Sequence, residues 1–381
     1  MPKKTDRKPN ILFLFADTGG GHRSAAEAII EAINLEFPGQ FITEMVDFFK
    51  DYSPPPLNLA GPTYPAMSKM TYMWEWMFKG SDDVDIMRRL YATLWPYIRR
   101  PLYRLIREHP CDMIIAVHPL VNEPILRGLK NKKINIPYLV VVTDLVSTHV
   151  AWFNNKASEV IVPTPQAATK ARLANLSKDK IRVIGLPVAD KFCHPAGDRK
   201  ALRAKLGWPE NKPMALLVGG GEGMGPLDKV AFAVDKAELP CGIAVITGKN
   251  KRMKKRLDKH TWNIPAFTYG FVKEMPEFMQ AVDILITKAG PGTISEAFIA
   301  GLPIILYHRV PGQEEGNVSY VVDEGAGVWA PDVEDILTTL TEWLKDPKKR
   351  QKVADIASRL ARPNAARDIA RLAAKYTGVI S

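Results

Sequence analysis

The sequence contains few cysteines and no long hydrophobic run. Three cysteines occur among 381 residues, at Cys111, Cys193 and Cys241, and none belongs to a CxxC pair. This spacing excludes the usual zinc and redox motifs and is typical of unpaired thiols in a reducing compartment. The apolar run Ile11–Ala16 is too short for a signal peptide or a membrane span. We therefore expect a protein of the cytosol or of the cytoplasmic face of a membrane, peripheral or monotopic.

The sequence has fewer acidic than basic residues: 41 Asp and Glu and 52 Lys and Arg, which gives a net charge of +11. A basic surface attracts nucleic acid, anionic lipid or phosphorylated substrates. No nucleic-acid-binding motif is present, so we expect no nucleic-acid partner. The densest basic cluster, residues 249–256, fits either a solvated helix face or a contact with an anionic surface.

Short apolar strands alternate with helical patterns along the chain, which predicts an α/β fold with parallel sheets. The length favours two domains, and the strands Ile11–Ala16 and Met214–Val218 each run into a glycine-rich turn. We predict two Rossmann-like domains that face a cleft, with ligands at the carboxyl ends of the strands. Further strands are predicted at Met113–Val117, Tyr138–Val142, Val160–Val162, Ile181–Ile184, Ile243–Thr247, Ala266–Tyr269, Ile284–Thr287 and Ile304–Tyr307, and helices at Ser24–Leu35 and, kinked at Pro363, at Pro347–Tyr376.

The first glycine-rich turn, DTGGGHRS at residues 17–24, leads from a strand into a helix. Gly20 and Gly21 let the backbone approach a ligand, and the helix start offers free N–H groups to an anion. The turn is neither a P-loop nor a GxGxxG fingerprint, which argues against a kinase and an NAD enzyme. We predict that His22 projects into the cleft, where an imidazole of pKa ~6.5 can deprotonate an acceptor hydroxyl.

Two more glycine-rich turns lie in the second half of the chain. Residues 219–225 hold five glycines in seven positions, and we predict that Gly220 and Gly221 cradle a diphosphate. The turn KAGPGTISEA, residues 288–297, places Gly292 and Thr293 at a helix start that can hold a phosphate. Glu296, expected in the first turn of that helix, is either stabilised by the helix dipole or accepts both hydroxyls of a ribose.

Two loops after strands carry polar side chains. The loop PGQEEGN at residues 311–317 contains Gln313 and Glu314, which are good partners for sugar hydroxyls. The loop VTDLVSTHVAWF at residues 142–153 places Asp144 and His149 at a predicted cleft edge. Trp152 in the same loop either packs against an acceptor or closes the core.

Residues 52–80 do not continue the alternation of strand and helix patterns and are rich in Pro, Met and aromatic residues. The first half has too many prolines for a plain strand or helix. For the second half, the pattern predicts an amphipathic helix that ends in Trp74, Trp76, Met77 and Phe78. The segment either packs on the core as a loop and helix or inserts into a lipid interface, where Trp and Tyr are favoured.

Four segments together resemble the motifs of the monogalactosyldiacylglycerol synthases and the bacterial diacylglycerol glucosyltransferases, over Asn10 to Ala330. The resemblance implies GT-B glycosyltransferase architecture. It implies an acceptor- and membrane-binding domain at residues 1–188, a nucleotide-sugar-binding domain at 189–360, and a final helix at 361–381 that returns to the first domain. The four segments are DTGGGHRSAAEAI, TDLVSTHVAWF, KAGPGTISEAFIAGLPIIL and VPGQEEGNVSYVVDEGAG.

The resemblance also implies roles for individual positions. His22 looks like the family's catalytic base, and Glu296 looks like its ribose ligand. Residues 52–80 lie where the family carries a membrane-contacting acceptor loop. Further donor contacts are implied for the backbone of Phe271 and Val272, which would hold the uracil edge, and for Gln313 and Glu314, which would bind the sugar.

The reaction that the resemblance implies is a single inverting displacement, in which His22 deprotonates the primary hydroxyl of diacylglycerol. The donor would be UDP-galactose, favoured by VPGQEEGNVSYVV, or UDP-glucose, and anionic lipids would bind the enzyme. The DxD pattern of residues 82–85 lies in the apolar N-terminal segment, so we expect no metal and no cofactor. Amides of the glycine loops and helix starts would stabilise the leaving UDP instead.

Three other functions stay open on the sequence. The same kind of enzyme could use another lipid acceptor, or the chain could be a UDP-sugar epimerase of two Rossmann-like halves. An epimerase would need no apolar segment at residues 52–80. A non-enzymatic membrane module is the third alternative, and the set of glycine loops argues against it.

Overall fold

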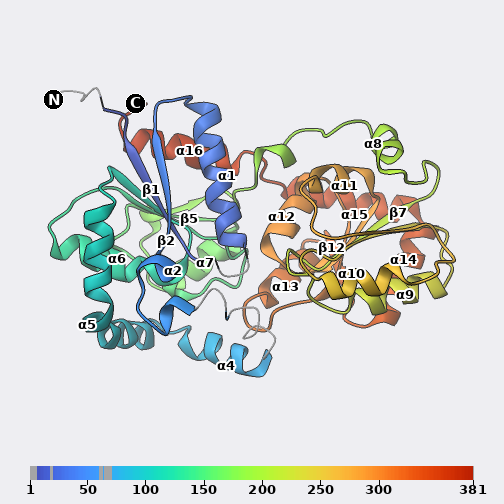
Figure 1. The fold of residues 1–381 in the computed structure, drawn as a ribbon, viewed down its shortest axis with the longest axis horizontal. Coiled ribbons are helices and arrows are strands. Elements are labelled where there is room, and N and C mark those ends of the chain that lie inside the picture. Colours follow the sequence, from blue (N-terminus) through green and yellow to red (C-terminus); the bar gives the residue numbers. More distant parts are fainter. Residues whose placement is uncertain (1–6, 18–19, 60–62, 64–70, 381) are drawn as a thin grey trace. The chain divides into compact units, whose positions relative to one another are not determined.

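The computed structural model describes residues 7–17, 20–59, 63 and 71–380 (Figure 1). These residues form two compact units. The first unit comprises the described residues up to Asp190, the short segment Pro311–Gln313 and the residues from Asn364 onward, and the second comprises Lys191–Val310 and Glu314–Pro363.

The first unit is built on a parallel sheet of six strands in the order β2-β1-β3-β4-β5-β6. The central strands are short apolar runs that are buried throughout, as expected where helices cover both faces of a parallel sheet. The strands are β1 (Asn10–Phe15), β2 (Ile42–Asp47), β3 (Met113–Ala116), β4 (Tyr138–Val141), β5 (Glu159–Val162) and β6 (Ile181–Val183).

Helices cover both faces of this sheet. One face packs against apolar residues of α5, α6 and α7, and the other packs against α1 and α16. The helices are α1 (Gly21–Glu36), α2 (Phe48–Tyr52), α4 (Thr71–Ser81), α5 (Val84–Glu108), α6 (Asn122–Asn131), α7 (Pro165–Leu173) and α16 (Ala365–Tyr376).

The last helix of the chain belongs to the first unit, where α16 lies beside α1 (Figure 1). Ile29 and Ile33 of α1 share a core cluster with Ile369 and Ala373 of α16. Arg367 of α16 bonds the carboxylates of Glu36 and Asp190, each at 2.8 Å. Two distant parts of the sequence therefore complete one hydrophobic layer.

The second unit repeats the design with six parallel strands in the order β12-β11-β10-β7-β8-β9. One face of its sheet packs against α9, α10 and α14. The strands are β7 (Met214–Val218), β8 (Gly242–Ile246), β9 (Ala266–Tyr269), β10 (Ile284–Lys288), β11 (Ile304–His308) and β12 (Gly327–Trp329). The helices are α8 (Arg199–Leu206), α9 (Leu227–Lys236), α10 (Lys251–Asp258), α11 (Met275–Ala281), α12 (Pro291–Ile299), α13 (Glu315–Asp323), α14 (Val333–Lys345) and α15 (Pro347–Leu360).

The α/β class is confirmed, and so are the ten predicted strands, to within a residue or two at their ends. The strands β2 and β12 were not predicted. The single kinked helix predicted for Pro347–Tyr376 is wrong, because α15 ends at Leu360 and a separate helix begins at Ala365. Pro363 lies in this break and cannot donate a backbone hydrogen bond to continue the first helix.

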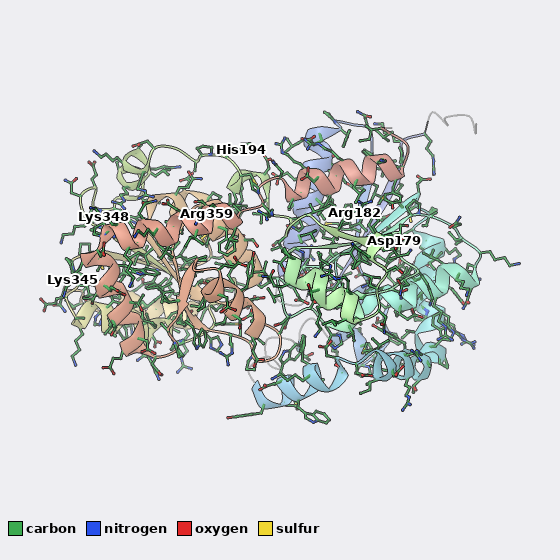
Figure 2. All side chains as sticks on the ribbon, turned by 180° about the vertical axis from the view of Figure 1, so that it is seen from behind. Asp179, Arg182, His194, Lys345, Lys348 and Arg359 are labelled. Atoms are coloured by element: carbon green, nitrogen blue, oxygen red, sulfur yellow. The ribbon has the colours of Figure 1, made fainter. Side chains whose placement is uncertain are left out.

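The surface charge is spread widely. Figure 2 shows Lys345, Lys348 and Arg359 on α14 and α15 of the second unit, and Arg182 on the edge strand β6 of the first. In the basic cluster of residues 249–256, Lys249 pairs with Glu222, Lys254 with Asp258 and Arg256 with Asp228. None of the helices that the structure describes is long and apolar enough to cross a bilayer.

Candidate functional site

His22 lies at the start of α1, after the turn that follows β1. Gly20, the residue before this helix, has φ 84°, a backbone conformation that glycine adopts without strain. Asp17 closes the start of the turn, because its amide donates to Asp47 Oδ2 at 3.0 Å and its carboxylate bonds Arg23. Thr18 and Gly19 lie outside the described residues. The turn thus holds His22 at the carboxyl end of the sheet, with α1 behind it.

The side chains around His22 come from the two strands that follow β1 in the sheet. Nδ1 of His22 lies 2.7 Å from Oγ1 of Thr143, the second residue after β4. His118, the second residue after β3, places its ring 4.7 Å from the ring of His22. Both Thr143 and His118 are buried. The ends of three neighbouring strands therefore converge on one imidazole.

His22 is neutral at physiological pH in this environment. Desolvation lowers the pKa of its imidazole from 6.5 to about 4, against smaller opposing effects of the Val117 carbonyl and the Asp17 charge. Desolvation and the nearby His22 also lower the pKa of His118 well below its usual value. A neutral imidazole keeps a lone pair, so His22 is in the form that can accept a proton.

Asp144 and Trp152, both predicted for the acceptor side, are bonded to each other. The indole Nε1 of Trp152 donates to Oδ2 of Asp144 at 2.6 Å. Trp152 is fully buried, and its ring lies 6.0 Å from that of His22. Trp152 therefore closes the core beneath the site. Gln313, whose segment belongs to the first unit, places Nε2 3.4 Å from the other oxygen of Asp144.

His149 ties the end of α4 to the loop after β4. Its Nδ1 accepts the amide of Ala151 at 3.1 Å, and its Nε2 lies 3.1 Å from Oγ of Ser81. The ring of Phe78 stands 5.2 Å from the imidazole. Asp82, the residue after α4, accepts the amide of Val150 at 2.8 Å. These contacts fix the junction between α4 and α5 beside the site.

The helix predicted for the second half of residues 52–80 is present as α4. Tyr72 and Trp76, one turn apart, are 89% and 76% exposed. Met73 and Met77 are exposed next to them. The predicted grouping of Trp74, Trp76 and Phe78 needs correction, because Trp74 and Phe78 are partly buried and Phe78 faces His149. Residues 60–62 and 64–70 of the segment lie outside the description.

In the second unit, the glycine-rich turn after β7 folds tightly on itself. A Cβ on Gly219 would lie 2.5 Å from the carbonyl oxygen of Met224, so no larger residue fits there. Gly220 has φ 70° and faces the side chain of Lys288, whereas a Cβ on Gly221 would meet nothing within 4 Å. Gly221 thus faces open space that suits a bound ligand, whereas the space beside Gly220 is taken by the Lys288 chain.

The next turn lies at the start of α12, which begins at Pro291 after the N-cap Gly290. A Cβ on Gly292 would meet nothing within 4 Å, so space is open beside this helix start. Glu296 does not lie in the first turn, as the sequence suggested, but in the second, because the helix begins earlier. Desolvation raises the pKa of its carboxyl to about 8. Glu296 is thus mostly protonated at pH 7.

Glu314 stands just before α13 and is buried. Its Oε2 accepts the amide of Val310 at 2.8 Å, and its Oε1 lies 2.5 Å from Nζ of Lys288. Sequence reasoning did not single out Lys288. Phe271 and Val272 follow β9, and Phe271 is exposed.

Comparison with known proteins identifies the family. The family model "Monogalactosyldiacylglycerol (MGDG) synthase" matches residues 22–188, and "Glycosyl transferases group 1" matches residues 198–359. Monogalactosyldiacylglycerol synthase 1, chloroplastic, of Arabidopsis thaliana is 37% identical over 372 residues, covering 95% of this chain and 70% of the relative. A probable monogalactosyldiacylglycerol synthase 2 of Oryza sativa subsp. indica is 38% identical, covering 97% and 81%.

The chain belongs to the monogalactosyldiacylglycerol synthase family. It is a glycosyltransferase, as the resemblance of its motifs implied, and the relatives support galactolipid synthesis. Every site residue from His22 to Glu314 falls within the aligned length of the family or within its group 1 domain.

Solved structures show the same GT-B fold. MurG of Acinetobacter baumannii superimposes with a TM-score of 0.62 at 17% identity, covering 96% of this chain and 99% of that one. The S. aureus MnaA–UDP complex gives 0.63 at 14% identity, with 98% of both chains covered. A UDP-GlcNAc 2-epimerase from Neisseria meningitidis gives 0.62 at 13% identity. Transferases and epimerases share this fold, so the family assignment comes from sequence and not from the fold.

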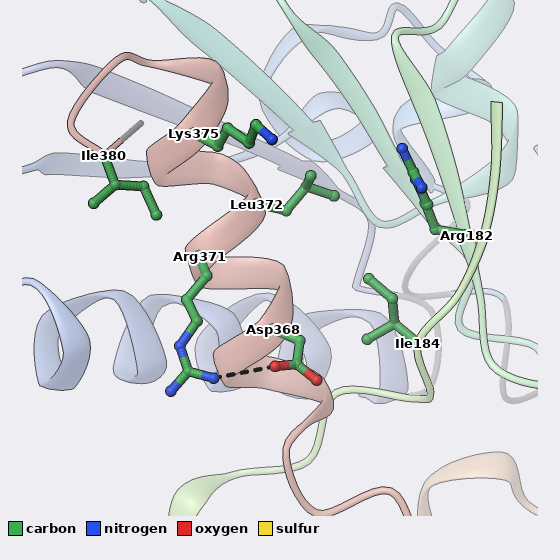
Figure 3. Close-up of a pocket in the computed structure, with 7 residues that line it drawn as sticks. All are labelled: Arg182, Ile184, Asp368, Arg371, Leu372, Lys375 and Ile380. Atoms are coloured by element: carbon green, nitrogen blue, oxygen red, sulfur yellow. Dashed lines mark hydrogen bonds and ion pairs between the residues drawn. The ribbon is translucent and has the colours of Figure 1, made fainter. Parts of the chain in front are cut away.

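A separate groove of about 370 Å³ lies between β6 and α16 of the first unit (Figure 3). Ile184, Leu372 and Ile380 give it an apolar lining. Arg182 and Arg371 at its edge are already paired, with Glu159 and Glu36 respectively. The groove contains none of the predicted site residues and is not part of the candidate site.

Proposed function

We propose that this chain transfers galactose from UDP-galactose to the primary hydroxyl of diacylglycerol in one inverting step, giving a β-linked galactolipid. The observation that carries the proposal is His22, partly buried and kept neutral by desolvation, at the converging ends of β1, β3 and β4. The family relationship supplies the class of acceptor. A single displacement needs one base and a stabilised leaving group, and His22 is the base in this proposal.

In the proposed step His22 acts as the general base. The proposal assigns the tautomer in which Nδ1 carries the ring proton and donates a hydrogen bond to Oγ1 of Thr143, 2.7 Å away. This tautomer leaves the lone pair of Nε2 for the lipid hydroxyl. As the hydroxyl loses its proton to Nε2, its oxygen attacks the anomeric carbon from the face opposite UDP. The bond between that carbon and the β-phosphate oxygen breaks, and its electron pair leaves with UDP. The α-linked donor thereby becomes a β-linked product.

The donor is proposed to bind to the second unit. Among the structural relatives, S. aureus MnaA is a complex with UDP and Anabaena Alr3699/HepE is a complex with UDP-glucose. The glycine turn after β7 and the start of α12 both offer backbone amides beside open space, which suits a diphosphate. Glu296 on α12 would hold the ribose, and the backbone of Phe271 and Val272 would hold the uracil edge.

Replacing Glu296 with alanine should weaken UDP binding by about 1–3 kcal/mol, because the ribose hydroxyls lose a hydrogen-bonding partner. Since the carboxyl is mostly protonated at pH 7, Glu296→Gln should lose less than Glu296→Ala. Isothermal titration calorimetry with UDP measures both. Unchanged affinity in the alanine variant would make Glu296 a packing residue of α12.

Turnover should not require a divalent cation. Among the described residues, no group of three or more His, Cys, Asp or Glu side chains is placed to hold a metal. Amides, a helix start and positive charge would stabilise the leaving diphosphate instead. We expect equal initial rates in EDTA and in magnesium. Complete loss in EDTA with rescue by magnesium or manganese contradicts this part of the mechanism.

The proposal also places the enzyme on the surface of an anionic membrane, through α4 and α5 of the first unit. The exposed face of α4 carries Tyr72 and Trp76, side chains that favour the lipid interface. The following helix α5 holds six arginines against only two acidic residues. Figure 1 shows α4 and α5 one after the other along one edge of the unit. The exposed arginines of α5 are Arg88, Arg89, Arg99, Arg100, Arg104 and Arg107.

A donor assay tests the whole proposal. The enzyme is incubated with UDP-galactose or UDP-glucose and diacylglycerol in anionic vesicles, and the lipid product and its anomeric configuration are identified by NMR. β-Galactosyl diacylglycerol as the main product supports the proposal. β-Glucosyl diacylglycerol would make the chain a glucosyltransferase, the second candidate. Conversion of the free nucleotide sugar without acceptor would favour an epimerase.

A further inference from the structure

Lys288 lies between the two glycine-rich turns of the second unit. It is the last residue of β10, directly before the turn that leads into α12. A Cβ on Gly220 would lie 3.2 Å from its Cε, and a Cβ on Gly290 would lie 3.1 Å from its Nζ. The absence of side chains at these two glycines makes room for the lysine chain. Its ammonium group therefore sits next to both of the turns that offer backbone amides to a ligand.

Glu314 holds this ammonium group in place. The Lys288 side chain is 16% exposed and the Glu314 side chain 6%, and Nζ and Oε1 are 2.5 Å apart. The second carboxylate oxygen is fixed by the amide of Val310. A charge this buried needs a partner, and Glu314 supplies one. An ammonium group has three N–H donors, so the bond to Glu314 leaves donors for an anion.

We propose that the Lys288 ammonium group binds the diphosphate of the nucleotide sugar, and that Glu314 positions it instead of contacting the sugar. This inference rests on the proposed function and deepens it. When the bond between the anomeric carbon and the phosphate oxygen breaks, negative charge builds up on the β-phosphate. The positive charge of Lys288 neutralises part of this negative charge, the task that a divalent cation performs in metal-dependent transferases.

The pairing of Glu314 with Lys288 also distinguishes Glu314 from its neighbour Gln313 in the loop at residues 311–317. Both oxygens of Glu314 are taken by groups of its own unit, whereas the neighbouring Gln313 belongs to the other unit. Two adjacent polar residues that look alike in sequence thus have different surroundings. Glu314 is a positioning residue in this inference, and Lys288 is the group that touches the ligand.

Calorimetry with uridine, UMP and UDP tests the inference on the full-length protein. Lys288→Met removes the charge and nearly preserves the length of the side chain. We expect its affinity for UDP to fall at least tenfold, its affinity for UMP to fall less, and its affinity for uridine to stay unchanged. Lys288→Arg should recover part of the UDP affinity. Lys205→Met, which breaks an exposed Lys–Glu pair on α8 of the same unit, is the matched control and should bind all three ligands normally.

The design separates folding from binding. Lys288→Met leaves Glu314 buried without its partner, so the double variant Lys288→Met/Glu314→Gln provides a neutral pair in the same place. Uridine affinity reports whether the nucleoside site is intact in each variant. If variants with normal uridine affinity bind UDP as tightly as the wild type, the inference is overturned and Lys288 is only the structural partner of Glu314. If the wild type binds no UDP, the proposed function itself fails.

Discussion

Replacing His22 with alanine should lower kcat by about two to four orders of magnitude, the usual loss on removing a general base. UDP binding should change little, because His22 belongs to the first unit and the donor is assigned to the second. The assay is initial rate on diacylglycerol vesicles, together with calorimetry for UDP. His194→Ala, which changes an exposed histidine (Figure 2), is the control and should keep its activity. If the His22→Ala variant keeps near-native turnover, His22 is not the general base.

The same residue sets a pH dependence. His22 can act as a base only when it is neutral, and its pKa is lowered from 6.5 to about 4. Activity should therefore persist as the pH falls through 6.5 and decline only near pH 4. The profile of kcat/KM reports this ionisation in the free enzyme. A fall in activity on the acid side centred at pH 6.5 would contradict a desolvated imidazole whose pKa is about 4.

Thr143 provides a finer test of the same site. Thr143→Val removes the hydroxyl that holds Nδ1 of His22 but keeps the shape of the side chain. Loss of one buried hydrogen bond costs about 1–1.5 kcal/mol, so kcat should fall about tenfold without a change in KM for the donor. Thr143→Ser should retain activity. The ¹⁵N chemical shifts of the imidazole show directly whether the ring changes its tautomer.

The second large effect is expected at the membrane. Changing Tyr72 and Trp76 to serine removes two exposed aromatic side chains from α4, each contributing about 1.5–3 kcal/mol if it inserts into lipid. Vesicle binding should fall at least a hundredfold, and activity on vesicles should fall with it. UDP binding should be unaffected. Leu173→Ser on α7, which changes another strongly exposed apolar residue of the first unit, is the matched control.

Charge reversal separates insertion from electrostatic attraction. Arg99 and Arg100 on α5 have no ion pair among the described residues, and each basic residue near an anionic surface contributes about 1 kcal/mol. Changing both to glutamate should lower binding to anionic vesicles and leave the weak binding to neutral vesicles unchanged. If the variants of α4 keep full vesicle binding and activity, the exposed face of α4 does not insert.

The fold could be predicted well because parallel strands covered on both faces appear as short apolar runs, as in β7, where every residue is buried. The strand β2 gave no such signal, because it lies at the sheet edge and only its last two residues are buried. The strand β12 has only three residues and lies at the edge of the other sheet. Edge strands carry too little buried apolar surface to stand out in a sequence.

Site residues that lie in a single glycine-rich turn could be predicted from the sequence. Site residues that meet only because their strands are neighbours in the sheet could not. His22 stands directly after a strand and glycines, a pattern that can be recognised locally. Thr143 and His118 reach it only because β1, β3 and β4 are neighbours in the sheet, although more than 90 residues separate His22 from either of them. The pair of Lys288 and Glu314 likewise joins residues 26 positions apart. The side on which Phe78 lies depends on where α4 begins, which the sequence left open.

The packing of α16 against α1 has a consequence for synthesis of the chain. Most of the first unit leaves the ribosome before any of the second, but Ile29 and Ile33 cannot join Ile369 and Ala373 in the core until the end of the chain has emerged. The helix that carries His22 at its start therefore cannot complete its hydrophobic layer during most of translation. Domains generally fold as units in the order of synthesis. Here the first unit is synthesised first but completes its folding last. A chain that stops before Asn364 lacks α16 and therefore lacks part of the hydrophobic layer that α16 shares with α1.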